Sequence, residues 1–317
     1  MTGFLVRRLL QAVIVVIGVM AFMFVLIHLI PGGEARAVLG PRAQPPAIAA
    51  FNKENGLNLP VWEQFFRYLW NLGHFQLGRS YYLNQNVTAL IGQALPKTLV
   101  LVGLSTLFAV VVAIPLGVYQ VVRRNKPEDY IITGLTFVLY AMPAFLLGTL
   151  LILWFGIYIK IFPTEAPQST SILGILSDPR ALVLPVLTLS AITIASFSRY
   201  MRSSMMETMT EDFVRTARAK GAGPQRVLYV HALRNAIIPI VTLLGLSLGT
   251  IVSGAVITES VFNYPGMGLL AINSAFREDL PTLLGVTFVV TIATIAGNLL
   301  ADILYAVVDP RIRYAKS

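Results

Sequence analysis

"LLQAVIVVIGVMAFMFVLIHLI", residues 9–30, decides the class of fold before any motif is considered. A helix that crosses a bilayer needs about 20 mostly apolar residues, because each residue rises about 1.5 Å through a hydrocarbon layer about 30 Å thick. This stretch meets that length. The whole 317-residue chain is 56% hydrophobic and only 12% charged, which exceeds what a soluble core requires. The sequence therefore predicts an all-α integral membrane protein.

Six windows are long and apolar enough to span, so six transmembrane helices are expected. They lie near residues 9–30, 98–122, 130–159, 181–200, 236–259 and 282–308. The first window follows Arg7 and Arg8, and "ARA" at residues 35–37 resembles a signal-peptide cleavage site. A signal-peptide core has only about 7 to 15 apolar residues, so we expect an uncleaved span instead.

The expected organisation has three parts. Residues 1–97 would hold the first helix and an extracytoplasmic module between helices 1 and 2. Residues 98–308 would form a five-helix core that carries a cytoplasmic loop at 201–235, and residues 309–317 would be a cytoplasmic tail. The long 31–97 segment alternates aromatic and polar residues, which fits either a contact with another protein or anchoring at the lipid interface.

Lysines and arginines predict the orientation, since they concentrate in cytoplasmic loops. Fifteen of the 24 lie at the termini, after the second window or in the loop before the fifth, and the short loops of the opposite face carry three. Both chain termini and the 201–235 loop should therefore be cytoplasmic. This distribution accounts for most of the net charge of +9 without any nucleic-acid partner.

Within that loop, "EDFVRTARAKGAGPQRVLYVHALRN", residues 211–235, predicts a helix, a glycine turn and a second helix. Thr210 is a plausible N-cap, and the acidic residues that follow it suit the start of a helix dipole. Gly221 should end the first helix, and Pro224 suits the first position of the second. From the residues alone, docking of another protein and simple solvation are both open.

The pattern "RTARAKGAGP" resembles the cytoplasmic signature loop of ABC importer permeases. Arg215 and Thr216 depart from the general pattern of that loop, as does "HALR" at residues 231–234. These departures are similar to those of the dipeptide and oligopeptide branch, which also includes nickel and glutathione importers. Further matches include "LGRS" at 77–80, "LPKTL" at 95–99, "ESVFNYPGMG" at 259–268 and "DPRIRY" near the end.

The resemblance implies a type I ABC importer permease fold in a bacterial plasma membrane. It also implies partners: a homologous second permease, two ATPase subunits, an extracytoplasmic substrate-binding protein and membrane lipid. The loop would dock on an ATPase subunit as a coupling helix. The residues expected to carry that coupling are Phe213, Arg215, Thr216, Ala217, Lys220, Gly221, Gly223 and Pro224.

Missing motifs narrow the function further. The phosphate-binding pattern Gly-x-x-x-x-Gly-Lys-Ser/Thr does not occur, so this chain should bind no cofactor, and ATP and Mg²⁺ would belong to the ATPase partners. The chain has no cysteine and only three histidines, in three separate regions. Catalytic residues and a metal site are therefore not expected, and the chain should not be an enzyme.

Polar residues at bilayer depth are scarce, which argues against a proton-coupled secondary transporter working alone. Asp302 is the main candidate, with Asn298 as a polar neighbour. Asp302 lies near the cytoplasmic end of its span, so a structural role in contact with water or an arginine is favoured over a proton relay.

Small residues recur at Gly245, Gly249 and Ser253, which would let a neighbouring helix approach closely or slide. Proline interrupts three windows, at Pro115, Pro143 and Pro185, and a gating hinge at Pro143 is one reading of that residue. Taken together, the sequence predicts a permease for short peptides, with nickel or glutathione as alternatives within the family.

Overall fold

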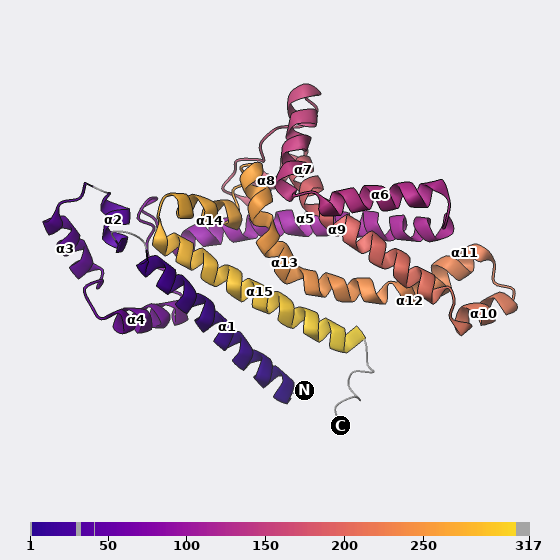
Figure 1. The fold of residues 1–317 in the computed structure, drawn as a ribbon, viewed down its shortest axis with the longest axis horizontal. Coiled ribbons are helices and arrows are strands. Elements are labelled where there is room, and N and C mark those ends of the chain that lie inside the picture. Colours follow the sequence, from indigo (N-terminus) through magenta and orange to yellow (C-terminus); the bar gives the residue numbers. More distant parts are fainter. Residues whose placement is uncertain (1, 30–32, 41, 309–317) are drawn as a thin grey trace. The chain divides into compact units, whose positions relative to one another are not determined.

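The computed structural model describes residues 2–29, 33–40 and 42–308, and its regular elements within these ranges are helices (Figure 1). The side chains of residues 2–5, 33, 37, 242, 245–254 and 300–308 lie outside the described set. By their contacts, the helices form two units: residues 1–98 with 265–295, and residues 99–264 with 296–317. Residues 265–295 thus group with the N-terminal part, whereas the sequence-based division had placed them in the five-helix core.

The helices of the first unit lie before residue 98 and between residues 265 and 295. They are α1 (Thr2–His28), α2 (Gly33–Leu39), α3 (Pro45–Glu54), α4 (Val61–Gly73), the start of α5 (Val87–Val122), α14 (Met267–Phe276) and the first half of α15 (Leu280–Val308).

The second unit holds the remaining helices and two π-helical turns, η1 and η2. They are α6 (Pro127–Ala141), α7 (Ala144–Leu151), η1 (Ile152–Tyr158), α8 (Ile172–Leu176), α9 (Pro179–Thr208), α10 (Asp212–Ala219), α11 (Pro224–Arg226), η2 (Val227–Ala232), α12 (Leu233–Ala236) and α13 (Ile238–Val261).

Four helical segments are long and apolar enough to cross a bilayer within the described part of the chain. They are Val6–His28, Val87–Val122, Pro179–Thr208 and Leu280–Leu299. The fifth window holds α13, a helix of 24 residues. The predicted windows at 9–30, 181–200, 236–259 and 282–308 therefore each contain one long helix, which confirms a multi-pass helical protein.

The second window was placed too short. The helix α5 begins at Val87 rather than near residue 98, and it runs for 36 residues. At about 1.5 Å per residue this is about 54 Å, well beyond the hydrocarbon thickness of about 30 Å. The helix is therefore longer than a single crossing requires, and its first third, residues 87–98, belongs to the first unit.

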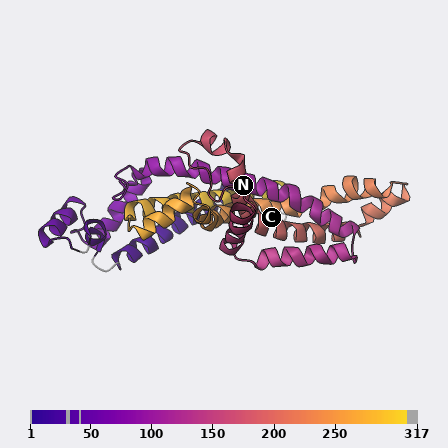
Figure 2. The same cartoon turned by 90° about the horizontal axis from the view of Figure 1, so that it is seen from above.

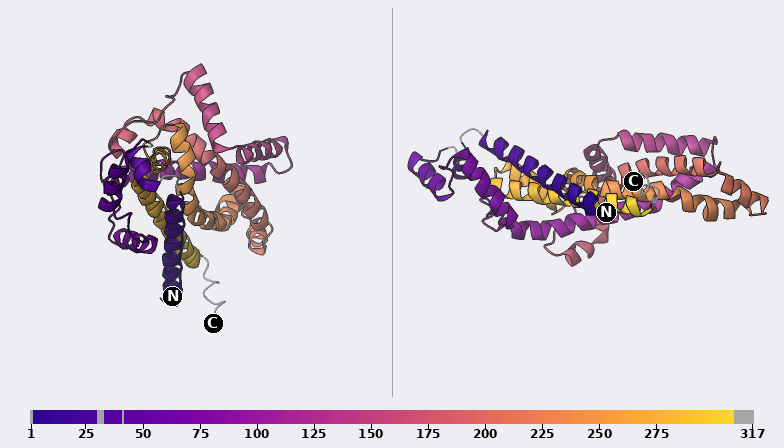
Figure 3. Two further views of the ribbon diagram at one scale, coloured as in Figure 1. Left: turned by 60° about the vertical axis from the view of Figure 1, so that its left-hand side comes forward. Right: turned by 90° about the horizontal axis from the view of Figure 1, so that it is seen from below.

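The third window is not one continuous helix, as the sequence suggested. The chain breaks between α6 and α7, and the two halves are bent by 107° (Figures 1 and 3). Met142 is extended, with φ −77° and ψ 127°, as expected for the residue before a proline, and Pro143 offers no N–H to continue the helix. Pro115 and Pro185, by contrast, lie inside the continuous helices α5 and α9.

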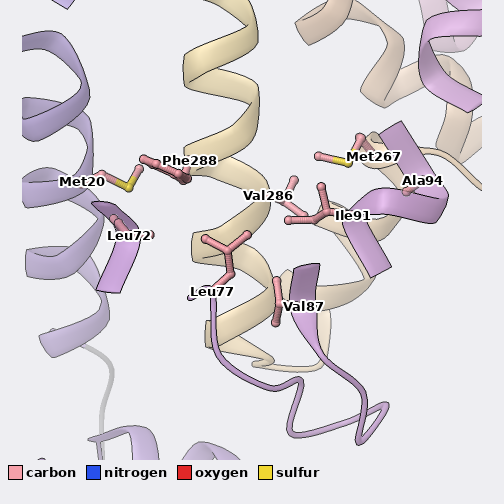
Figure 4. Close-up of a cluster of buried hydrophobic side chains, with 9 residues drawn as sticks. All are labelled: Met20, Leu72, Leu77, Val87, Ile91, Ala94, Met267, Val286 and Phe288. Carbon is pink, nitrogen blue, oxygen red and sulfur yellow. The ribbon is translucent and has the colours of Figure 1, made fainter. Parts of the chain in front are cut away.

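The first unit has an apolar core built from α1, α4, α5, α14 and α15. Figure 4 shows its buried members: Met20, Leu72, Leu77, Val87, Ile91, Ala94, Met267, Val286 and Phe288. Residues far apart in sequence meet here, and burial of their apolar surface holds the unit together. The N-terminal segment and the start of α15 are thus one packed body.

A buried carboxylate ties two loops of this unit together. Asp279, directly before α15, accepts hydrogen bonds from the Ser80 hydroxyl, from the Tyr81 N–H at 3.1 Å and from the Thr282 hydroxyl at 2.7 Å. The "LGRS" stretch is therefore joined to the loop that precedes α15. A buried carboxylate requires such donors, because its desolvation would otherwise be costly.

In the second unit, α9 packs against α6, α7, α12 and α13. Its inner face supplies Phe197, Met201 and Met205 to a buried cluster that also contains residues of α5, η2, α12 and α13. Gly117 of α5 lets the two backbones approach closely, because a Cβ at this position would lie 2.6 Å from the Met201 Cβ and 2.8 Å from the Ser198 carbonyl oxygen. Helix α9 is therefore the centre of this unit.

Candidate functional site

The 211–235 loop is the segment that carries most of the predicted site residues. It leaves α9 and returns through η2 and α12 into α13, with α10 and α11 beyond the ends of α9 and α12 (Figures 1 and 2). The structure confirms the predicted helix, glycine turn and second helix. The predicted N-cap is wrong, because α10 starts at Asp212 with Glu211 at the cap position, and the Thr210 hydroxyl instead donates to the Glu207 carbonyl at 2.7 Å.

The first helix ends in a Schellman motif at Gly221. The Gly221 N–H donates to the Arg218 carbonyl at 2.9 Å, and the Ala222 N–H donates to the Ala217 carbonyl at 3.1 Å. These two bonds are the 5→2 and 6→1 pair that defines the motif. Gly221 has φ +79°, the left-handed conformation that glycine adopts without a steric penalty.

The second helix begins at Pro224, with Gly223 at its cap. The Val227 N–H donates to the Gly223 carbonyl at 3.0 Å, so the first helical turn closes even though proline brings no donor of its own. Residues 227–232 then form the π-helical turn η2, which a sequence pattern of apolar spacing does not distinguish from an α-helix.

A small apolar core fixes the angle between the two helices. Val214, Ala217 and Val227 are buried, and Met209 and Ala222 pack against them. The contact between Ala217 and Ala222 is the apolar pair that usually accompanies a Schellman motif. The loop is therefore a folded unit and not a flexible connection.

The outer surface of the loop is basic and partly apolar. Phe213 is 41% exposed, and Arg215, Thr216, Lys220 and Gly221 are exposed as well. Arg215 lies 3.5 Å from Asp212, but both side chains face solvent, so this pair contributes little to stability. The surface thus combines an exposed aromatic ring with cations, two residue types that are also enriched in the cores of protein interfaces.

The loop is joined firmly to the spans that it connects. Leu228 and Ala232 of η2 and Ala236 of α12 belong to the same buried cluster as Met201 and Met205 of α9. The Ser204 hydroxyl of α9 also donates to the Ala236 carbonyl at 2.9 Å. A displacement of the loop would therefore be passed to α9 and α13.

The remaining predicted residues lie elsewhere. Pro143 is at the break between α6 and α7. Gly245, Gly249 and Ser253 fall in α13, and Asp302 falls in α15, but their side chains are outside the described residues, so their expected roles stay predictions. Asn298 is exposed on α15. The structure thus brings together the eight loop residues and does not bring the others into the same site.

Sequence reasoning missed one feature beside the loop, the ion pair between Asp129 and Arg202. Arg202 lies near the end of α9, and Asp129 lies in the first turn of α6. The available signal was the acidic pair at residues 128–129 after Pro127, which marks a helix start but does not identify the partner, 73 positions later. Within the described residues, no group of three or more His, Asp or Glu side chains is arranged to hold a metal.

A multi-pass helical membrane protein with a packed helix–turn–helix loop between two spans is the class that this fold defines. The chain belongs to the family of binding-protein-dependent transport system inner membrane components. The model of that family matches residues 105–314, and the model of the family's N-terminal region matches residues 1–102. The chain is therefore a permease component of a transport system.

Three relatives illustrate how far the similarity extends. The chain is 35% identical over 316 residues to the oligopeptide transport system permease protein AppB of Bacillus subtilis, covering 99% of this chain and 100% of that protein. It is 35% identical over 339 residues to the dipeptide transport system permease protein DppB of Escherichia coli K12, covering all of both chains. It is 36% identical to the oligopeptide permease OppB of Haemophilus influenzae, over 99% of this chain and 100% of that one.

Proposed function

We propose that this chain is one permease subunit of an ATP-driven importer of dipeptides and oligopeptides. It would pair with a homologous second permease to enclose the path, receive cargo from an extracytoplasmic binding protein and be driven by two ATPase subunits. Full-length similarity to permeases named for peptide transport supports the cargo class. The packed 211–235 loop supports the coupling role.

The loop is the observation that carries the mechanism. Its apolar core keeps α10 and α11 at a fixed angle, while Phe213 and the cations remain available to a partner. A docked ATPase subunit would move this rigid element, and the shared cluster with α9 and α13 would carry that movement into the spans. ATP and Mg²⁺ would be bound by the ATPase subunits, and this chain would bind neither.

The orientation follows from the charge distribution. The loop and both termini would lie in the cytoplasm, because lysines and arginines concentrate on that side of the bacterial plasma membrane. The first 98 residues would then place their packed module outside, where a binding protein arrives. The three-part division of the chain expected from the sequence, with a tail at 309–317, remains part of this proposal.

Reconstitution of the chain with and without its neighbouring transport subunits tests the proposal. Vanadate-sensitive uptake of a radiolabelled dipeptide should require every subunit. Peptide uptake by this chain alone, driven by a proton gradient and lost on Asp302→Asn, would instead support a secondary transporter. Uptake of Ni²⁺ or glutathione in place of peptide by the complete assembly would reassign the cargo within the family.

Crosslinking tests the coupling role directly. A photoreactive group at position 213 should capture an ATPase subunit in the assembled transporter, and one at Leu173, 81% exposed at the other end of the second unit, should not. Capture of an ATPase from both positions, or from neither, would remove the support for docking through this loop.

A further inference from the structure

The first unit contains a recess that the transport assignment does not explain. It has a volume of about 320 Å³, and it is lined by the outer end of α1, by α2, α4 and the start of α15, and by the loops between them. A second hollow of about 270 Å³ shares several of its lining residues, including His28, Glu34 and Gln64. A volume of this size is within the range of small-molecule sites, about 300–1,000 Å³.

One carboxylate dominates the chemistry of the recess. The Tyr81 hydroxyl donates to Glu34 Oε1 at 3.1 Å. Burial raises the pKa of Glu34, and the hydrogen bond from Tyr81 and the charge of His28 oppose this rise in part. Burial also raises the pKa of Tyr81, so its hydroxyl remains protonated and its oxygen can still accept a further hydrogen bond.

Gln64 and Arg67, two other polar residues of the lining, are already engaged. Gln64 donates through Nε2 to the Leu57 and Leu59 carbonyls at 3.1 and 2.8 Å, which turns its Oε1 toward His28 at 3.4 Å. Arg67, the arginine in the lining, lies 3.4 Å from Glu63 on the same helix. The recess therefore offers acceptors without an arginine or lysine contact to Glu34 among the described side chains.

The recess is held in shape by the rest of the unit. The Tyr81 N–H is bonded to Asp279, and the Tyr81 ring makes an edge contact with Phe51 at 5.6 Å between centroids. The Tyr68 hydroxyl donates to the Met20 sulfur at 3.3 Å. These contacts hold Tyr81 and the neighbouring lining residues in place. The arrangement of Glu34 and Tyr81 is therefore present without a ligand.

We propose that this recess binds a primary ammonium group, and that its source is the N-terminus of an incoming peptide. An ammonium group brings a positive charge and three donors, which match the Glu34 carboxylate and the Tyr81 hydroxyl oxygen. A transition metal fits less well, because the described residues provide no group of three His, Cys, Asp or Glu ligands. The choice of a peptide rests on the proposed function, with an ethanolamine lipid headgroup as the other source of the same chemistry.

Binding to the full chain in nanodiscs of phosphatidylcholine tests the recess. The probes are alanyl-alanine and N-acetyl-alanyl-alanine, followed by ligand-observed NMR. The free amine should bind at least about tenfold more tightly, because a charge-assisted hydrogen bond contributes about 1.5–3 kcal/mol. Glu34→Gln should remove this preference and Tyr81→Phe should reduce it, whereas Glu54→Gln, an exposed carboxylate of the same unit, should leave it unchanged.

Each of the following results would contradict the assignment of the recess to the ammonium group of a peptide. Equal binding of both peptides, or an unchanged preference in correctly folded Glu34→Gln protein, would refute an ammonium site. Binding that disappears when the nanodiscs contain phosphatidylethanolamine would assign the recess to a lipid headgroup. Displacement of the dipeptide by Ni²⁺ in the wild type, but not in Glu34→Gln, would make it a metal site.

Uptake by the complete transporter is measured in parallel, so that the two proposals fail separately. If no peptide is taken up while the nanodisc measurement still shows the amine preference, the transport proposal is wrong, and only the ammonium site stands, without an incoming peptide as its ligand. If free and acetylated dipeptides are taken up equally and bind equally, the recess is excluded and the transport proposal stands.

Discussion

Arg202 of α9 holds Asp129 of α6 through two parallel bonds, from Nε to Oδ1 at 3.0 Å and from Nη2 to Oδ2 at 2.8 Å. The carboxylate also accepts from the Asn125 N–H at 3.3 Å and from Gln120 Nε2 at 3.4 Å. The pair therefore joins α9 to the turn between α5 and α6. Because α9 continues into the 211–235 loop, this contact fixes the end of the helix from which the loop departs.

We expect Asp129→Asn to destabilise the protein. Loss of one partner of a buried pair costs about 3–5 kcal/mol, and the lower part of that range applies because the Arg202 side chain is 29% exposed. The midpoint of thermal unfolding in detergent measures the effect. The double variant Asp129→Leu with Arg202→Leu should have an unfolding midpoint closer to the wild type than either Asp129→Leu or Arg202→Leu alone. Equal decreases of the midpoint in these three variants would contradict a specific ion pair.

Gly221 and Gly223 provide a matched test of the loop. A side chain at either position meets no atom within 4 Å, but only Gly221 has positive φ. Gly221→Ala should cost about 1–2 kcal/mol in local strain, and Gly221→Pro should also remove the N–H bond to Arg218. Transport should fall in this order, and Gly223→Ala should show no loss of stability from backbone strain.

The readout for these glycine variants is ATP hydrolysis and peptide uptake in the same proteoliposomes. Gly221→Pro and Arg215→Glu should insert normally and hydrolyse ATP with little uptake. Normal uptake in both variants would show that the geometry of the loop does not matter for coupling.

Gly117 is expected to be intolerant of any side chain. A Cβ there would lie 2.8 Å from the Ser198 carbonyl oxygen, a backbone atom that cannot rotate away. Gly117→Ala should therefore destabilise the second unit by about 1–3 kcal/mol, the usual effect of overpacking. Gly103→Ala in the same helix, where nothing lies within 4 Å, is the control, and thermal unfolding should separate the two.

Peptide binding to the recess should weaken on acidification. Glu34 must be ionised to hold an ammonium group, and because burial raises its pKa, binding should begin to fall at a higher pH than for an exposed glutamate. The groups in the lining that change charge or carry it are His28, Arg67, Tyr68 and Tyr81.

Alanyl-alanine affinity measured from about pH 7 to about pH 5, where the amino group of the dipeptide is mostly protonated, tests this dependence. The His28→Gln variant should retain most of the pH dependence of the affinity, and the Glu34→Gln variant should lose it. A pH dependence that survives in Glu34→Gln and is lost in His28→Gln would show that the Glu34 carboxylate does not govern binding.

Local signals in the sequence predicted the parts of the fold that depend on neighbours along the chain. Apolar length located the spans, and Gly221 with Pro224 located the turn of the loop, because a Schellman motif and a proline start are set within a few residues. The sequence did not predict the 107° bend, since Pro115 and Pro185 show that proline alone does not break a span.

Contacts between residues far apart in the chain could not be predicted from the sequence, for a different reason. The Tyr81–Glu34 bond joins positions 47 apart, and the Arg202–Asp129 pair joins positions 73 apart. Nothing in a single sequence identifies which of 15 acidic side chains meets which partner. The recess could therefore be found only once α1, α2 and α4 were seen together.

The close backbone approach at Gly117 limits which helices can shift against one another. A side chain at Gly117 would meet the Met201 side chain and the Ser198 carbonyl oxygen, and Arg202 binds Asp129 of α6, so α9 is packed tightly against both α5 and α6. We therefore expect α5, α6 and α9 to move together as one body. Relative movement of the spans is then expected at the break before α7, where α6 and α7 are bent by 107°.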